Sequence, residues 1–341
     1  MQIMALPLFL LPLLLLLPLL AESKLSLDYY QKTCPDFPKI IQQVVTDKQL
    51  ASPTTAAGAL RVFFHDCVVG GCDASVLLSS NNVNTTERDN DINRSLPGDA
   101  FDLVIRAKTA LELQCPGIVS CSDILAEATR DLVTMVGGPF YPIRLGRKDS
   151  RESKSSDVEG HIARANMSMT QIIDIFAGKG LNIQEMVALS GAHTIGFSHC
   201  SEFSNRIFSF SKTSQIDPSM NPQYAERLRE LCENYTKDST IAAFNDAITP
   251  GKFDNMYYVN LRRGLGLLAS DQAMASDPRT KPFVDLYAAN QTAFFDAFSR
   301  VMEKVTVFNV KTGNKGEVRR RCDASNELQS NGNPMDANAK H

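Results

Sequence analysis

The sequence predicts a mostly α-helical fold, on three observations. Several segments carry apolar residues at three- and four-residue intervals, which is the spacing of an amphipathic helix. The alternation of apolar and polar residues that is typical of half-buried strands is scarce. The chain of 341 residues is long enough for one large domain, or for two subdomains, with a sizeable core.

The predicted helices follow one another along the chain, with no internal repeat of fixed period. Residues 52–67 begin with Ser-Pro, a favourable N-cap and first-turn pair. The other predicted helices are residues 103–115, 121–136, 169–180, 183–196, 278–290 and 291–305. An aromatic content of 8% and a charged content of 21% are typical of a globular protein. The net charge of −3 argues against a nucleic-acid partner.

The two ends of the chain differ from the rest in composition. Residues 1–20 form a Leu-rich run broken by prolines, and Ala-Glu-Ser follows, so residues 1–23 are predicted to be a signal peptide. A membrane anchor is the alternative, but the apolar run is short and Pro-interrupted. No later segment is long and apolar enough to span a bilayer. Residues 323–341 are polar and are predicted to be a flexible tail.

Eight cysteines indicate disulfides, because an even number behind a signal peptide suits an oxidising compartment. A zinc site is the alternative, but no pair has CxxC spacing. Spacing alone suggests only the pair Cys67–Cys72, across a Gly-containing turn. Asparagines 84, 93, 166, 234 and 290 lie in N-x-S/T sequons, which fit a secreted glycoprotein.

The stretch "RVFFHDCVVGGCDAS" combines a cation and a titratable base. Arg61 and His65 are four residues apart, so they share one face of a helix, and apolar residues surround them. A neighbouring cation lowers the pKa of a histidine, which leaves it neutral and able to take a proton near pH 7. The cation itself can stabilise negative charge in a transition state. The pair alone is also typical of a solvated helix face.

The residues that follow offer oxygen ligands for calcium. Asp66, Asp73 and Ser75 have side-chain oxygens, and Val69 and Gly71 can offer carbonyl oxygens. The pattern is not an EF-hand, because the order of acidic residues and the twelfth-position Glu are absent. An ordinary Asp/Gly turn held by a disulfide is the alternative.

A second histidine of interest is His193, in "LSGAHTIG" at the end of a helical run. It is either a satisfied core histidine or a metal ligand. A ligating imidazole usually donates its other N–H to a carboxylate, so the second reading requires an Asp or Glu elsewhere in the chain.

Three motifs together closely resemble the secreted plant (class III) haem peroxidases: "RVFFHDCVVGGCDASVLL", "LSGAHTIG" and "TPGKFDNMYYVNL", the last followed by "GLLASDQAM". The resemblance runs from Tyr30 to Cys322. It implies a two-subdomain helical fold with four disulfides, in which one haem b lies between a distal subdomain, residues 24–160, and a proximal subdomain, residues 161–322.

The resemblance also assigns roles near the haem. On the proximal side, it makes His193 the axial iron ligand and Asp271 its carboxylate partner. The distal residues that it implies are the base His65, the cation Arg61, the aromatic Phe64, the asparagine Asn93 that orients the base, and Glu87, which reaches calcium through water. Asn93 would be buried in this role, so it is predicted to carry no glycan.

The resemblance further implies two calcium sites. The distal ligands are Asp66, Val69, Gly71, Asp73 and Ser75, and the proximal ligands are Thr194, Asp246, Thr249, Lys252 and Asp254. The implied disulfides are Cys34–Cys115, Cys67–Cys72, Cys121–Cys322 and Cys200–Cys232. Pro139 is matched to a substrate-entrance residue, and Phe140 beside it could stack on the substrate ring.

The implied activity is the reduction of hydrogen peroxide to water with one-electron oxidation of small phenolic donors. The expected location is outside the cell or in the vacuole, as a monomer with no membrane or nucleic-acid partner. Val68, the "SLPGDAF" insertion, Phe197 and Glu202 depart from the usual pattern of the family, which leaves the donor undetermined. Two alternatives remain: a secreted helical binding protein of this fold without activity, and a zinc hydrolase.

Overall fold

The fold is mostly helical, as predicted, in the computed structural model, which describes residues 25–80 and 85–327. The predicted signal peptide, the Asn84 sequon and most of the predicted tail lie outside these residues. The α-helices are α1 (Phe37–Ala51), α2 (Thr55–Val69), α3 (Gly98–Gln114), α4 (Cys121–Met135), α5 (Met169–Ala177), α6 (Ile183–Ser190), α7 (Ser204–Phe208), α8 (Pro222–Leu231), α9 (Met256–Arg262), α10 (Ala269–Met274), α11 (Lys281–Ala289) and α12 (Gln291–Thr306). The 3₁₀ helices span Ser75–Leu77, Glu87–Asp89, Ser155–Asp157, Gly191–Thr194 and Cys200–Glu202.

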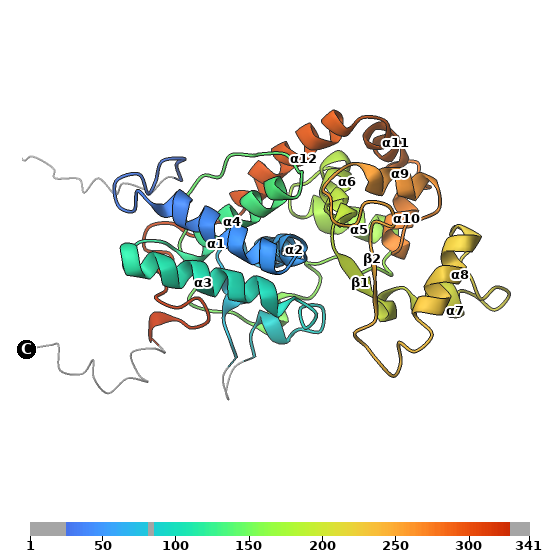
Figure 1. Cartoon of the computed structure of the whole chain (residues 1–341), viewed down its shortest axis with the longest axis horizontal. Coiled ribbons are helices and arrows are strands. Elements are labelled where there is room, and N and C mark those ends of the chain that lie inside the picture. Colours follow the sequence, from blue (N-terminus) through green and yellow to red (C-terminus); the bar gives the residue numbers. More distant parts are fainter. Residues whose placement is uncertain (1–24, 81–84, 328–341) are drawn as a thin grey trace, which may run out of the picture.

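The helices form two groups in space (Figure 1). Helices α1 to α4 pack against one another in one half of the molecule. Helix α6 packs on α12, and α9 packs on α11, in the other half. Helices α7 and α8 lie at the far end and enclose a smaller apolar cluster of their own. None of the described helices is long and apolar enough to cross a membrane.

The only sheet in the described part of the chain is a two-stranded antiparallel ribbon between the two groups. Strand β1 (Phe197–His199) pairs with β2 (Ala242–Phe244), and Phe197 lies directly opposite Phe244. The ribbon follows the 3₁₀ helix that carries His193, so it lies beside the candidate site.

The predicted helix over residues 183–196 is shorter in the structure. Helix α6 starts with a capping box, in which Asn182 and Glu185 each accept from the other's backbone N–H, and it ends at Ser190. A Cβ atom at Gly191 would lie 2.3 Å from the Tyr258 hydroxyl oxygen and 2.5 Å from the Phe294 ring. Glycine is therefore required there, and the chain continues as a 3₁₀ turn that presents His193.

Helix α2 also differs from the prediction at its start. The prediction used Ser52 as its N-cap, but the Ser52 backbone N–H donates to the Lys48 carbonyl and ends α1 instead. Helix α2 begins at Thr55 and is buried on almost all sides, including at His65 and Asp66. A helix enclosed in this way holds its side chains in fixed positions, which suits a catalytic element.

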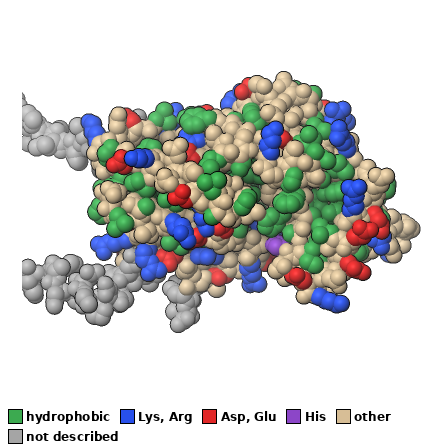
Figure 2. Space-filling model, in the orientation of Figure 1, with side chains coloured by type: hydrophobic (Ala, Val, Ile, Leu, Met, Phe, Trp, Pro, Cys, Tyr) green, Lys and Arg blue, Asp and Glu red, His purple; other side chains and the backbone are tan. Residues whose placement is uncertain are grey.

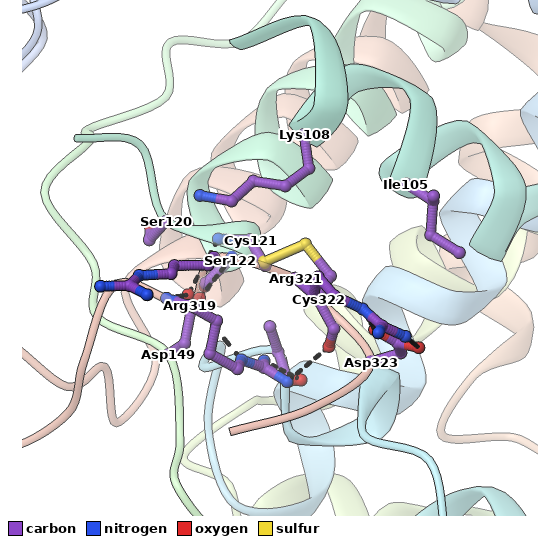
Figure 3. Close-up of a disulfide and its surroundings, with 12 residues drawn as sticks. Ile105, Lys108, Ser120, Cys121, Ser122, Asp149, Arg319, Arg321, Cys322 and Asp323 are labelled. Atoms are coloured by element: carbon purple, nitrogen blue, oxygen red, sulfur yellow. Dashed lines mark hydrogen bonds and ion pairs between the residues drawn. A yellow bond between two sulfur atoms is a disulfide. The ribbon is translucent and has the colours of Figure 1, made fainter. Parts of the chain in front are cut away.

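The four disulfides join Cys34–Cys115, Cys67–Cys72, Cys121–Cys322 and Cys200–Cys232, and these are the pairs that the resemblance implies. Figure 3 shows the Cys121–Cys322 bridge, which fixes the C-terminal segment to the start of α4. Beside it, the Arg319 backbone N–H donates to the buried Asp149 carboxylate at 2.9 Å. The last part of residues 161–322 thus lies against the first half of the chain.

Candidate active site

Helix α2 and the loop before α3 bring the predicted distal residues together. His65 is 5% exposed, and its Nδ1 lies 2.6 Å from Oδ1 of Asn93, which is itself 3% exposed. The Asn93 amide Nδ2 donates to the Glu87 carbonyl at 2.8 Å. Because Nδ2 is engaged in this way, the oxygen of Asn93 faces the imidazole, so His65 Nδ1 carries the proton and donates it. The Nε2 lone pair of His65 is then free to accept a proton.

The charge state of His65 suits a general base. Burial lowers the pKa of His65 to about 3, with a further lowering from the Arg61 charge, against which the Asn93 hydrogen bond acts. The imidazole is therefore neutral throughout the physiological pH range. A neutral imidazole with a free nitrogen can take a proton from a bound substrate.

Arg61 is fixed by the same loop that holds Asn93. Its Nη1 donates to the Ser95 carbonyl at 3.0 Å, and its Nη2 donates to Ser95 Oγ at 2.9 Å and to the Ile92 carbonyl at 3.3 Å. Burial lowers the pKa of Arg61, and the Glu202 charge raises it. Even so, a guanidinium keeps its proton in proteins, so Arg61 is a permanent cation beside His65.

Phe64 closes one side of the distal group. Its ring stacks on the ring of Phe176 from α5, with centroids 6.1 Å apart, and contacts His65 edge-on at 6.3 Å. Phe176 was not singled out from the sequence, and its place in the helical pattern of α5 indicated only a core position.

His193 has the geometry expected of a metal ligand with a carboxylate partner. Its Nδ1 lies 3.0 Å from Oδ1 of Asp271, at the start of α10. Burial lowers the pKa of His193, but the Asp271 carboxylate outweighs this effect and the pKa is raised. Of the His193 side chain, 42% remains accessible, and no described residue hydrogen-bonds its Nε2. The Arg61 charge also acts to lower the pKa of His193, so the distal group lies close enough to His193 to interact with it.

The predicted distal calcium ligands gather around buried carboxylates. Asp66 accepts from the backbone N–H groups of Asp73 and Ala74 at 3.1 and 2.9 Å. Burial and the charges of Asp73 and Glu87 raise the pKa of Asp66 well above its ordinary value. Burial also raises the pKa of Glu87 to about 7. Such a cluster of like charges favours a bound cation.

The remaining atoms of this cluster fit calcium as well. Ser75 Oγ and Glu87 Oε2 are buried and have no hydrogen-bond partner outside this cluster among the described residues. Gly71 has a φ of 133°, and a Cβ there would lie 2.4 Å from the Asn309 carbonyl oxygen, so only glycine allows this turn. Lys311 forms an ion pair with Asp73, which neutralises part of the negative charge. Oxygen ligands of mixed type around buried carboxylates are what calcium prefers.

The predicted proximal ligands converge in the same way. Thr194 Oγ1 lies 3.3 Å from Asp246 Oδ2, 3.4 Å from the Lys252 carbonyl oxygen and 3.5 Å from Asp254 Oδ1. Thr249 Oγ1 lies within 3.3 Å of the same two carboxylates. Both aspartates are buried. Thr194 directly follows His193, so a cation held here would brace the histidine.

These oxygen clusters are not clusters of side chains alone. In the described part of the chain, no group of three or more His, Cys, Asp or Glu side chains is placed to hold a metal ion. Any metal site in these regions therefore also draws on hydroxyl and carbonyl oxygens, which suits calcium better than zinc.

Pro139 is not brought to the two histidines by any contact found among the described residues. The loop that contains it packs beside the proximal cluster: a Cβ at Gly138 would meet Val133 and the ring of Phe253, which lies between Lys252 and Asp254. Phe140 is exposed, lies under the Arg130 guanidinium at 4.5 Å and accepts a hydrogen bond from Ser299 through its carbonyl. The substrate contacts of Pro139 and Phe140 stay a prediction.

Comparison with known proteins identifies the family of the chain. The family model described as "Peroxidase" matches residues 41–290, which is more than half of the chain. The chain therefore belongs to the peroxidase family.

Its relatives are plant enzymes of similar length. The chain is similar to Peroxidase 6 of Arabidopsis thaliana, at 62% identity over 92% of this chain and 95% of the relative. It is also similar to Peroxidase 65, at 62% identity over 89% of this chain and 90% of the relative, and to Peroxidase 41, at 61% over 89% and 92%, both from the same plant. The protein is thus an oxidoreductase with peroxidase activity, and the family implies haem, calcium, hydrogen peroxide and a reducing substrate.

Proposed function

We propose that the protein is a secreted peroxidase with one haem b and two calcium ions, which reduces hydrogen peroxide to water and oxidises small phenolic donors. Residues 24–160 would form the distal subdomain and residues 161–322 the proximal subdomain, with the signal peptide, residues 1–23, removed. The polar tail, residues 323–341, would be flexible, and the enzyme would act as a monomer in the extracellular space or the vacuole.

The single observation that supports this proposal most strongly is the complementary state of the two histidines. Nδ1 of His65 is hydrogen-bonded to Asn93, and Nδ1 of His193 is hydrogen-bonded to Asp271. Nε2 of each histidine is therefore left free, with one imidazole neutral and the other made more basic by a carboxylate. His193 would hold the haem iron through Nε2, and His65 would remain available as the base.

When bound, the haem supplies the redox chemistry, because it accepts two oxidising equivalents from peroxide and returns them to two donors one at a time. His65 would take one proton of hydrogen peroxide at Nε2 and return it to the oxygen that leaves as water. The Arg61 guanidinium stabilises the negative charge that develops on that leaving oxygen. Each donor loses one electron and one proton, so two donors complete the reduction of one peroxide to two waters.

The two oxygen clusters would keep these groups in place. Asp66 directly follows His65, and Thr194 directly follows His193, so each cluster holds the residue next to a histidine. A calcium ion in either cluster would neutralise its buried carboxylates, and Glu87 would reach the distal ion through a water molecule. The sequons support secretion, and the oxygen clusters support the two calcium ions. The phenolic donors are supported by the family.

The experiment that tests the proposal is a quantitative analysis of the purified protein for haem, iron and calcium, with His193→Gln and His161→Gln beside it. His161 is a control for haem and iron only, because its Nδ1 contacts the carbonyl of Val69, a predicted distal calcium ligand, and not His193. We expect one haem and two calcium ions per chain, with the iron spectrum altered only in His193→Gln. Protein from a haem-sufficient host that contains zinc and no haem would refute the proposal.

A further inference from the structure

The ribbon between the two halves carries an exposed aromatic pair. Phe197 and Phe244 lie opposite each other on β1 and β2, and they are 43% and 52% exposed. Residues opposite each other on paired strands have their Cβ atoms about 5 Å apart, so the two side chains project from the same face of the ribbon. The Phe197 ring also contacts the His199 ring edge-on, with centroids 6.1 Å apart. Their solvent-facing position is one where polar side chains are ordinarily found.

This aromatic surface is rigidly attached to the proximal side of the site. Thr194, beside His193, lies three residues before β1, and Asp246 lies two residues after β2. The Asn245 backbone N–H donates to the Gly196 carbonyl at 3.1 Å, and Ser198 Oγ donates to Asn245 Oδ1 at 2.7 Å. The base of the ribbon is therefore the predicted proximal calcium cluster, which fixes the rings relative to His193.

The ribbon also lies against the distal helix. A Cβ at Gly196 would be 3.1 Å from the Cβ of Ala57, and Ala57 is one helical turn before Arg61 on α2. Hydrophobic side chains gather on the face drawn in Figure 2, over the region where Figure 1 places β1 and β2. The aromatic pair therefore lies on a ribbon whose base is next to both His193 and the helix that carries Arg61 and His65.

One carboxylate lies directly after the ribbon in the chain. Glu202 is exposed and ends the 3₁₀ helix that follows β1, and its charge acts to raise the pKa of Arg61. A negative group there repels a donor that carries its own carboxylate and tolerates a neutral one.

We propose that Phe197 and Phe244 form a docking platform for uncharged aromatic donors of two or more rings. The phenol that reacts enters the cavity, and the next ring of the same molecule lies on the two phenylalanines. This inference rests on the proposed function and names a donor class for it: extended, neutral phenols rather than phenolic acids. Contact between aromatic rings attracts the donor, and the Glu202 carboxylate disfavours donors that carry a negative charge.

The test compares donors that differ in one respect, using the haem- and calcium-loaded enzyme. Coniferyl alcohol and a phenolic dimer built from it differ in ring number, and coniferyl alcohol and ferulate differ in the carboxylate. The variant is Phe197→Thr with Phe244→Thr, because threonine keeps the β propensity of the strands. The matched control is Phe210→Thr, which removes a ring that is 42% exposed on a loop elsewhere.

We expect the double variant to raise KM for the dimer about 10-fold, with kcat and the rate constant for peroxide unchanged and KM for coniferyl alcohol changed less than about twofold. Phe210→Thr should change none of these values, and Glu202→Gln should improve ferulate alone. Equal losses for the dimer and for coniferyl alcohol, or the same effect in Phe210→Thr, would overturn the platform.

Binding without turnover separates this inference from the proposed function. Calorimetric titration of the dimer into the enzyme without peroxide should show weaker binding in the double variant, even if the protein proves inactive. If no donor reacts with the wild-type enzyme, but the phenolic dimer binds to it and not to the double variant, only the proposed function is refuted. Light scattering tests a different occupant of this surface. If the wild-type protein forms a protein dimer and the double variant is a monomer, the surface pairs two copies of the chain and the donor platform is wrong.

Discussion

Replacing Asn93 by alanine tests how the protein controls His65. The substitution removes the 2.6 Å hydrogen bond to His65 Nδ1 and the 2.8 Å hydrogen bond to the Glu87 carbonyl. Both partners are then buried without the side chain that satisfied them. The imidazole loses the acceptor that fixes its tautomer, so its Nε2 is no longer held as the free base.

The size of the effect follows from these two bonds. A buried polar group left without its partner costs about 1–3 kcal/mol, so the free energy of unfolding should fall by about that amount. If a similar free energy separates the productive tautomer from the others, the rate constant for reaction with peroxide should fall about 5- to 150-fold. The donor step should change little, because Asn93 is not at the ribbon.

The assay is stopped-flow absorbance of the haem band after mixing with hydrogen peroxide, under conditions in which denaturant titration shows the variant to be folded. Asn90→Ala is the matched control, since its Nδ2 donates to the Ser155 carbonyl at 3.1 Å and it does not contact His65. A peroxide rate constant for Asn93→Ala within twofold of the wild type would refute the role given to Asn93.

Three further predictions concern the two histidines and the oxygen clusters. Since burial lowers the pKa of His65 to about 3, the base is neutral above that value, so the peroxide rate constant should stay flat between about pH 5 and 8; a midpoint near 6.5 would contradict this. Asp271→Asn removes the carboxylate that raises the pKa of His193, so the haem reduction potential should rise in a spectroelectrochemical titration. An unchanged potential would show that Asp271 does not tune the iron ligand. Calcium chelation should lower the unfolding temperature, because it leaves buried carboxylates without a cation. Asp246→Asn should make this decrease smaller, and an equal decrease in the variant would show that Asp246 is not a calcium ligand.

Much of the helical fold could be predicted from hydrophobic spacing. Helices α4 and α12 lie almost exactly where their pattern placed them, because each has a wide apolar face on the core. Helix α8 was not recognised: its sequence is strongly polar and only two of its residues are buried. Helix α6 was predicted too long: it ends at Ser190, and the chain continues as the 3₁₀ helix Gly191–Thr194. The contact of Gly191 with Tyr258 and Phe294 is tertiary, so local spacing could not show it.

The residues of the candidate site also divide into those that local sequence predicts and those that it does not. The Arg61–His65 spacing and the oxygen-rich turn could be recognised locally, since they lie on one helix and the turn after it. The partners Asn93 and Asp271 could be assigned only through the family resemblance, because they come from segments 28 and 78 residues away from their histidines. Local sequence carries no information on which distant segments pack together, and for the same reason it suggested only one disulfide pair.

The reaction with hydrogen peroxide is the decisive test of the role of His65 as the base. The measurement is the second-order rate constant for hydrogen peroxide in the calcium-loaded holoenzyme, in the wild type and in His65→Ala with the haem content shown to be equal. The account predicts a loss of about 10²- to 10⁴-fold in the variant, which is the usual contribution of a general base. A variant that reacts with peroxide as fast as the wild type would show that His65 is not the base, and the mechanism derived from its geometry would be wrong.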